Sequence, residues 1–139
     1  MKQFYLFSLI LIVTLSSSFS PINENTKFSI IGKWVTQDDK GNLMSFTFKE
    51  DGHYEMNTPE GTQKTDKKAD LSYVFDQSKS PMWIDLIMKN KKDERMTLTL
   101  KGIVEIVDND NIKMNMGGDE RPSDFFGKKV AAFQRASKK

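Results

Sequence analysis

The sequence contains no cysteine and only one histidine, His53. Without cysteine there is no disulfide scaffold, no thiol nucleophile, no thiolate zinc site and no lipidated cysteine. A single histidine also excludes zinc and iron sites that need two or three histidines. No Gly-x-Ser-x-Gly motif is present to expose a serine nucleophile. We therefore expect no enzyme, no metal and no cofactor, and we expect His53, next to Gly52, to be an exposed hairpin residue.

A strong excess of one charge sign is also missing. The 139 residues include 21 lysines and arginines and 19 acidic residues, which gives a net charge of +2. A nucleic-acid-binding domain of this size usually carries a clear basic excess. We expect no nucleic-acid partner, and the length predicts a single folded domain.

Long apolar runs are absent except near the N-terminus. Residues 4–15 are uncharged and mostly apolar, follow Lys2 and precede a serine-rich stretch at 16–20. This run would span about 18 Å as a helix, well short of a hydrocarbon core of about 30 Å. The pattern predicts a cleaved signal peptide, and hence a secreted or periplasmic protein with no membrane span in the mature chain. An uncleaved membrane anchor is the alternative.

An amphipathic helix longer than a turn or two is absent from the rest of the pattern, with residues 123–128 as the one candidate exception. From Ile30 onward apolar and polar residues alternate, as in Met44, Phe46 and Phe48, which is typical of strands with one face toward a core. Asp-, Asn- and Gly-rich turns separate these segments. We predict an all-β fold, an antiparallel up-and-down barrel of about eight strands. The predicted divisions are a signal peptide at 1–20, a leader at 21–29, the barrel at 30–135 and a basic tail at 136–139.

Four short motifs occur in a distinctive order. They are Gly32-Lys33-Trp34, Ile84-Asp85-Leu86, Gly102-Ile103-Val104-Glu105 and Glu120-Arg121-Pro122. Their order resembles a family of uncharacterised, exported bacterial lipocalin-like domains, which are calycin-like barrels. The chain departs from the family pattern at Val104, where tyrosine is favoured, at Ser123, where threonine is favoured, and at Met114-Asn115.

The resemblance implies a structural role for two residues. In calycin barrels a tryptophan of the first strand closes one end, and a basic residue of the last strand lies across it. The matching residues here are Trp34 and Arg135, which would form a cation–π contact worth about 0.5–2 kcal/mol. Arg121 is the alternative partner, or it pins a loop through a local ion pair.

The inward face of the predicted barrel is rich in aromatic residues and methionine. A barrel of about eight strands holds either packed side chains or one small ligand. The residues that we expect to line a ligand cavity are Phe46, Phe48, Tyr54, Met56, Tyr73, Phe75, Leu98 and Met114. The first hypothesis is an exported binding protein for a small apolar or amphipathic ligand. The alternative is a structural or interaction protein with a filled barrel, which binds a cell-envelope protein through loops or an outer apolar patch around Trp83 and Ile87.

Two charged runs interrupt the strands, at 64–70 and at 90–95. Both runs are short and mix basic with acidic residues, so neither has the pattern of an interaction tail. We expect each to be a charged connection or solvent-exposed strand start, most simply a solvated hairpin tip.

Overall fold

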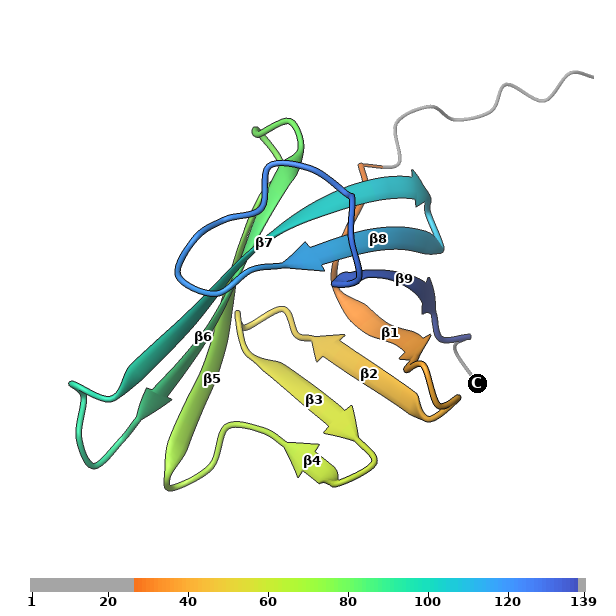
Figure 1. The fold of residues 1–139 in the computed structure, drawn as a ribbon. Coiled ribbons are helices and arrows are strands. Elements are labelled where there is room, and N and C mark those ends of the chain that lie inside the picture. The colour runs from red at the N-terminus through yellow and green to blue at the C-terminus, as the bar shows by residue number, and fades with distance from the viewer. Residues whose placement is uncertain (1–26, 138–139) are drawn as a thin grey trace, which may run out of the picture.

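The computed structural model describes residues 27–137 of the chain (Figure 1). The predicted signal peptide, most of the predicted leader and the last two residues of the basic tail lie outside the described residues. Within 27–137 there is no helix, and therefore none long and apolar enough to cross a membrane.

The described residues form nine strands, separated by short connections and one long connection, 117–129. They are β1 (Gly32–Gln37), β2 (Leu43–Phe48), β3 (Tyr54–Thr58), β4 (Gly61–Gln63), β5 (Ala69–Asp76), β6 (Met82–Asn90), β7 (Thr97–Asp108), β8 (Asn111–Met116) and β9 (Val130–Arg135). All pairings are antiparallel and form one sheet in the order β4-β3-β2-β1-β9-β8-β7-β6-β5. The sheet curls into a half-barrel (Figure 1), which confirms the predicted all-β, antiparallel, barrel-like fold.

The half-barrel is open between the edge strands β4 and β5. Strand β9 returns to pair with β1 at Trp34–Arg135 and Val35–Gln134, so the first and last strands lie side by side. Across the open edge, one isolated bridge joins His53 to Ser72 of β5. Figure 1 shows β5, β6 and β7 extending away from β2, β3 and β4 at one end of the molecule. This end is called the open end below.

Turn chemistry sets the hairpins. Between β1 and β2 the carboxylate of Asp38 accepts the backbone N–H groups of Lys40 (2.9 Å) and Asn42 (2.8 Å). Gly41 has a φ of 83°, in a region that L side chains rarely adopt. The chain therefore reverses at Asp38–Asn42, where the sequence predicts a turn.

The inner face of the sheet holds the core. Alternate residues of eight strands point inward, and the most deeply buried include Trp34, Phe48, Ile84, Ile112 and Met114. Strand β4 is different, because all three of its residues are exposed. The core therefore depends on β1–β3 and β5–β9, and β4 is a short addition at one edge.

A second, smaller buried layer lies on the outer face of the sheet. The connection 117–129 crosses over β7 and β8 (Figure 1). Beneath it Ile103 is only 1% exposed although its neighbours Gly102 and Val104 belong to the inner face. Asn115 is also buried there and donates a hydrogen bond to the carbonyl of Asp124 (2.8 Å). Strand alternation alone places Ile103 and Asn115 in solvent, so the covering connection explains their burial.

Candidate functional site

Seven of the eight residues predicted to line a ligand cavity pack into the core. Phe48, Tyr54 and Met114 are buried, and Phe46, Met56, Tyr73 and Phe75 are partly buried against them. The eighth, Leu98, is half exposed.

Aromatic rings occupy the space between the strands of the inner face. The ring centres of Phe48 and Tyr73 lie 4.9 Å apart, and Phe46 lies 6.0 Å from Phe48 and 5.8 Å from Phe133. These separations fall in the range of directly packed rings. Burial raises the pKa of the Tyr54 phenol, which lies in the same cluster. The middle of the half-barrel is therefore occupied by the protein's own side chains.

Trp34 and Arg135 are directly paired where β1 meets β9, in the interior of the sheet. The guanidinium carbon of Arg135 is 4.2 Å from the centre of the Trp34 ring. The same guanidinium donates hydrogen bonds to the backbone carbonyls of Ile31 (2.7 Å), Ser29 (2.8 Å) and Asn109 (3.1 Å). One side chain thus covers the core tryptophan and joins β9 to two other backbone segments, residues 29–31 and the β7–β8 turn.

Arg121 contacts the other tryptophan, Trp83. Its guanidinium carbon lies 4.3 Å from the Trp83 ring centre, and its Nη2 donates to Asp85 at 2.6 Å. Its Nη1 donates to the carbonyl of Gly102 at 2.6 Å. Arg121 therefore fixes the connection 117–129 to the outer face of β6 and β7. The ion-pair partner of Arg121, Asp85, is distant in the sequence, and the guanidinium of Arg121 covers part of the Trp83 ring.

An apolar groove lies at the open end, on the extension of the inner face. It has a volume of about 450 Å³, and its lining residues are Lys68, Ala69, Met88, Asn90, Arg95, Met96, Thr97 and Leu98. Met88 pairs with Leu71 on one side and with Leu98 on the other. Leu71 is buried, Met88 is half-buried, and Leu98 is 50% exposed. The apolar strip of the inner face thus continues from the core into solvent.

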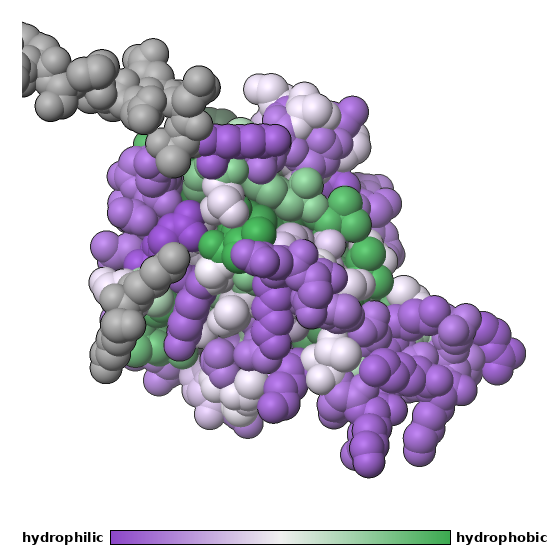
Figure 2. Space-filling view, turned by 180° about the vertical axis from the view of Figure 1, so that it is seen from behind, coloured by the Kyte–Doolittle hydropathy of each residue, from purple (hydrophilic) through white to green (hydrophobic). Residues whose placement is uncertain are grey.

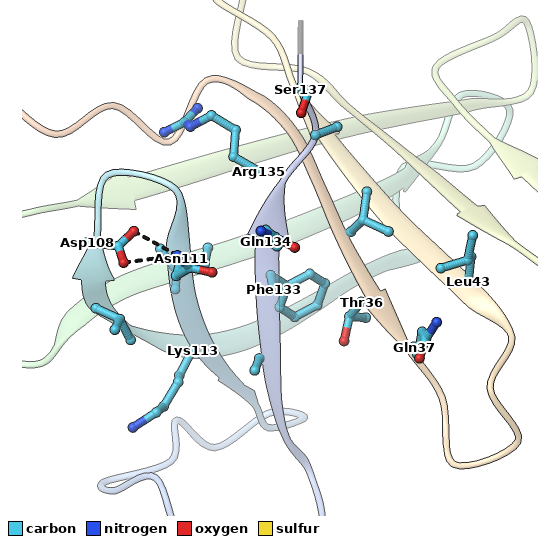
Figure 3. A pocket seen from close by; sticks show the side chains of 15 residues that line it. Thr36, Gln37, Leu43, Asp108, Asn111, Lys113, Phe133, Gln134, Arg135 and Ser137 are labelled. Atoms are coloured by element: carbon cyan, nitrogen blue, oxygen red, sulfur yellow. Dashed lines mark hydrogen bonds between the residues drawn. The ribbon is translucent and has the colours of Figure 1, made fainter.

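A larger hollow, of about 810 Å³, lies over β1, β9 and β8 (Figure 3). Its exposed apolar members are Leu43 and Val107. The amide of Asn111 donates to both carboxylate oxygens of Asp108, each at 2.9 Å, as the dashed lines in Figure 3 show. These polar groups are thus engaged in the β7–β8 turn. The groove is the better candidate, because its apolar floor continues into the core.

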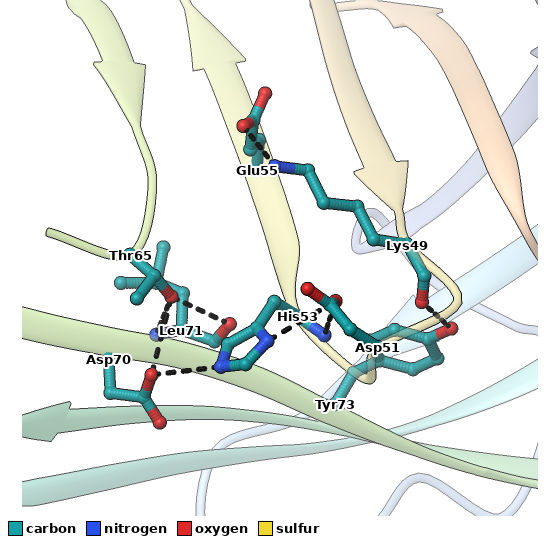
Figure 4. A network of polar contacts seen from close by, with 8 residues as sticks. All are labelled: Lys49, Asp51, His53, Glu55, Thr65, Asp70, Leu71 and Tyr73. Atoms are coloured by element: carbon teal, nitrogen blue, oxygen red, sulfur yellow. Dashed lines mark hydrogen bonds and ion pairs between the residues drawn. The ribbon is translucent and has the colours of Figure 1, made fainter.

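His53 is the centre of a polar network at the open edge of the sheet (Figure 4). Its Nε2 lies 3.1 Å from Asp70 and its Nδ1 lies 3.2 Å from Asp51. Both ring nitrogens thus face carboxylates. The hydroxyl of Thr65 contacts Asp70 (3.4 Å), so the order of groups does not match a nucleophile–histidine–acid arrangement. The network joins the β2–β3 turn to β5.

Metal ligation has no candidate in the described part of the chain. No group of three or more histidine or acidic side chains within 27–137 could hold a metal ion.

The chain was also compared with known proteins. No protein-family model, no curated protein and no solved structure matches it. The candidate function therefore rests on the groove and on the side chains around it.

Proposed function

We propose that this chain is an exported, non-catalytic binding protein that holds a small apolar or amphipathic molecule in the groove at the open end. The observation that carries the proposal is the continuous apolar strip from buried Leu71 through Met88 to exposed Leu98. Apolar side chains left in solvent beside a core are a common feature of ligand sites. The resemblance to exported lipocalin-like domains and the N-terminal pattern support export and binding.

The groove suits this class of ligand in size and lining. Its volume of about 450 Å³ lies within the usual range of about 300–1,000 Å³ for small-molecule sites. Met88 and Met96 supply flexible thioether chains that adapt to ligands of different shape. Lys68 and Arg95 stand at its rim, where they can meet a polar or anionic end of the ligand.

A ligand in the groove lies outside the aromatic cluster, because no aromatic side chain lines the groove. Phe48 packs against both Phe46 and Tyr73. A ligand in the groove leaves these ring contacts, and their packing against the core, undisturbed. Of the predicted cavity residues, Leu98 is the one that contacts the ligand in this arrangement. The others support the strands that carry it.

Binding is tested with a fluorescent fatty acid titrated into the chain from Pro21 to Lys139. This chain keeps every strand and every core residue and lacks the apolar run at 4–15. We expect saturable binding, weakened about tenfold or more by Leu98→Glu, because the ligand then loses the burial of one leucine and meets a charge. Leu43→Glu is the matched control, since Leu43 is exposed and lies outside the groove.

Two results contradict the proposal. One is the absence of saturable binding by the unaltered chain, and the other is an equal loss in the Leu98 and Leu43 variants. Native mass spectrometry of the protein purified from its own host provides an independent check, because a bound small molecule adds its mass to the chain.

The packed aromatic cluster favours a second candidate function, a cell-envelope interaction protein with a filled barrel. The same two experiments separate the candidates. A chain that co-purifies with no small molecule and binds no fatty acid is expected under this second function.

A further inference from the structure

Two charged segments that are far apart in the sequence lie together at the open end. The connection 64–68 precedes β5, and the turn 91–96 joins β6 to β7. The backbone N–H of Lys91 donates to the carbonyl of Lys68 (2.9 Å), and its Nζ donates to the carbonyl of Asp66 (2.6 Å). Neither charged run by itself predicts this contact. Together residues 64–70 and 89–95 are called the lysine-rich tip.

The lysine-rich tip carries a net positive charge, whereas the rest of residues 21–139 carries a net negative charge. The tip contains seven basic and four acidic side chains, a net charge of +3. The rest of residues 21–139 contains 13 basic and 15 acidic side chains, a net charge of −2. Figure 2 shows hydrophilic side chains projecting from this end of the molecule. The protein is therefore electrically polarised, with its positive end at the open end of the sheet.

Several lysines of the tip are not neutralised within the molecule. Asp93 pairs with Arg95 (3.0 Å), and Glu94 pairs with Lys89 (3.0 Å). The Oδ1 of Asp66 accepts the backbone N–H groups of Lys68 and Ala69. Among the residues that the structure describes, Lys67, Lys68 and Lys92 form no ion pair within 4.0 Å. These three charges face solvent and are available to an external anion.

Exposed apolar side chains lie beside these lysines. Met96 is 63% exposed and Leu98 is 50% exposed, and both line the groove that Lys68 borders. Lysines around exposed aliphatic side chains are typical of surfaces that enter the headgroup region of an anionic membrane. No aromatic side chain lines the groove, whereas single-stranded nucleic acid is usually held by aromatic stacking.

We infer that the lysine-rich tip docks the protein on an anionic lipid bilayer. Met96 and Leu98 enter the interfacial region, and Lys67, Lys68 and Lys92 face the lipid phosphates. This inference goes beyond the proposed function, because docking does not require a ligand in the groove. It also orients the groove toward the bilayer, a source of amphipathic molecules.

Flotation with lipid vesicles tests the inference on the chain 21–139. We expect binding to equimolar phosphatidylcholine and phosphatidylglycerol vesicles, weak binding to pure phosphatidylcholine, and a decrease with added salt. Lys67→Gln/Lys68→Gln/Lys92→Gln should weaken binding about 100-fold, at about fivefold for each lysine near an anionic surface. The matched control is Lys33→Gln/Lys128→Gln/Lys129→Gln, which removes three exposed lysines elsewhere and should change binding less than threefold.

A second pair of variants tests the apolar contact. Met96→Gln/Leu98→Gln should weaken binding to the anionic vesicles while every lysine remains. Leu43→Gln/Val107→Gln replaces two equally exposed apolar residues on another surface and should leave binding unchanged. Urea unfolding of all four variants checks that each remains folded.

Three outcomes overturn the inference: no binding to anionic vesicles, an equal loss in the two lysine variants, or equal binding to a single-stranded oligonucleotide. The last result would indicate a general polyanion surface. Failure of membrane docking is distinguishable from failure of ligand binding in the groove, because fatty-acid binding is measured without vesicles. The variant Lys67→Gln/Lys92→Gln, which leaves Lys68 at the rim of the groove in place, should weaken binding to the anionic vesicles about 25-fold and keep its fatty-acid affinity.

Discussion

Two arginines perform different tasks although each lies over a tryptophan. Arg135 covers buried Trp34 and donates hydrogen bonds to the backbone carbonyls of Ser29, Ile31 and Asn109. Arg121 covers half-exposed Trp83 and donates a hydrogen bond from one nitrogen to the carboxylate of Asp85. The planar guanidinium allows ring contact and several hydrogen bonds at once, which an ammonium group does not.

At the residue scale we therefore expect Arg135→Lys to destabilise the fold by about 2 kcal/mol. The lysine keeps the charge but loses at least one of the hydrogen bonds to Ile31 and Ser29 and most of the ring contact. Urea unfolding followed by tryptophan fluorescence measures the difference. Arg95→Lys is the control, because Arg95 is exposed and, among the described residues, its side chain forms hydrogen bonds and an ion pair only with Asp93. Equal midpoints for the two variants would contradict a closing role for Arg135.

Elements of this fold are separated by turns in which aspartates cap backbone N–H groups. Asp66 shows the effect clearly, because hydrogen bonds from the N–H groups of Ala69 and Lys68 hold the pKa of its carboxyl below the usual value. Hydrogen bonds from Ser78 lower the pKa of Asp76 in the same way, and those from Arg95 lower the pKa of Asp93. Each of these carboxylates is more stable as an anion in the folded chain than in the unfolded chain.

At the element scale this predicts acid-sensitive turns. A lowered folded pKa adds stability above the unfolded pKa of about 3.9, and this stability is lost as the pH falls through the folded value. We expect the urea midpoint to hold between pH 7 and pH 5 and to fall below about pH 4. Asp66→Asn should show a smaller fall, and Asp39→Asn, whose carboxylate accepts no hydrogen bond in the described structure, should behave as the unaltered chain. A midpoint that rises on acidification would contradict this account.

Much of this element structure follows from the sequence, because strand alternation and Asp- and Gly-containing turns are local signals. The all-β antiparallel fold was predicted on that basis. The burial of Ile103 and Asn115 was not, because it depends on a connection that returns over the outer face. The Arg121–Asp85 pair was missed for the same reason, since strand register decides which distant groups meet.

The candidate site was predicted only in part. Leu98 was included among the ligand residues, but Met88 and Met96 were not. Alternation indicates which side chains point inward, and says nothing of where the two halves of the sheet separate. That separation decides whether an inward side chain is buried, like Met114, or exposed, like Leu98.

At the scale of the whole molecule, stability is unevenly distributed over the sheet. Strands β7 and β8 are paired on both sides, and around Ile103 and Asn115 they are covered on both faces, by the core and by the connection 117–129. Strand β4 is an exposed edge of three residues. Backbone amides buried between two layers exchange slowly with solvent, and amides at exposed edges exchange quickly. We therefore expect β4 to exchange fastest among the strands, and the central part of β7 slowest.

Arg121→Ala tests whether the connection 117–129 is a separate layer of the molecule. The backbone N–H of Lys101 donates to the carbonyl of Gly118 (3.1 Å), and the N–H of Gly117 donates to the carbonyl of Lys101 (2.8 Å). Without the bonds of Arg121 to Asp85 and Gly102, this covering segment should open more often. Hydrogen exchange should then accelerate at Lys101, Ile103 and Asn115, while the amides between β1 and β2 keep their rates. A uniform acceleration over the sheet would contradict a separate layer, because it would mean that Arg121 stabilises the fold only as a whole.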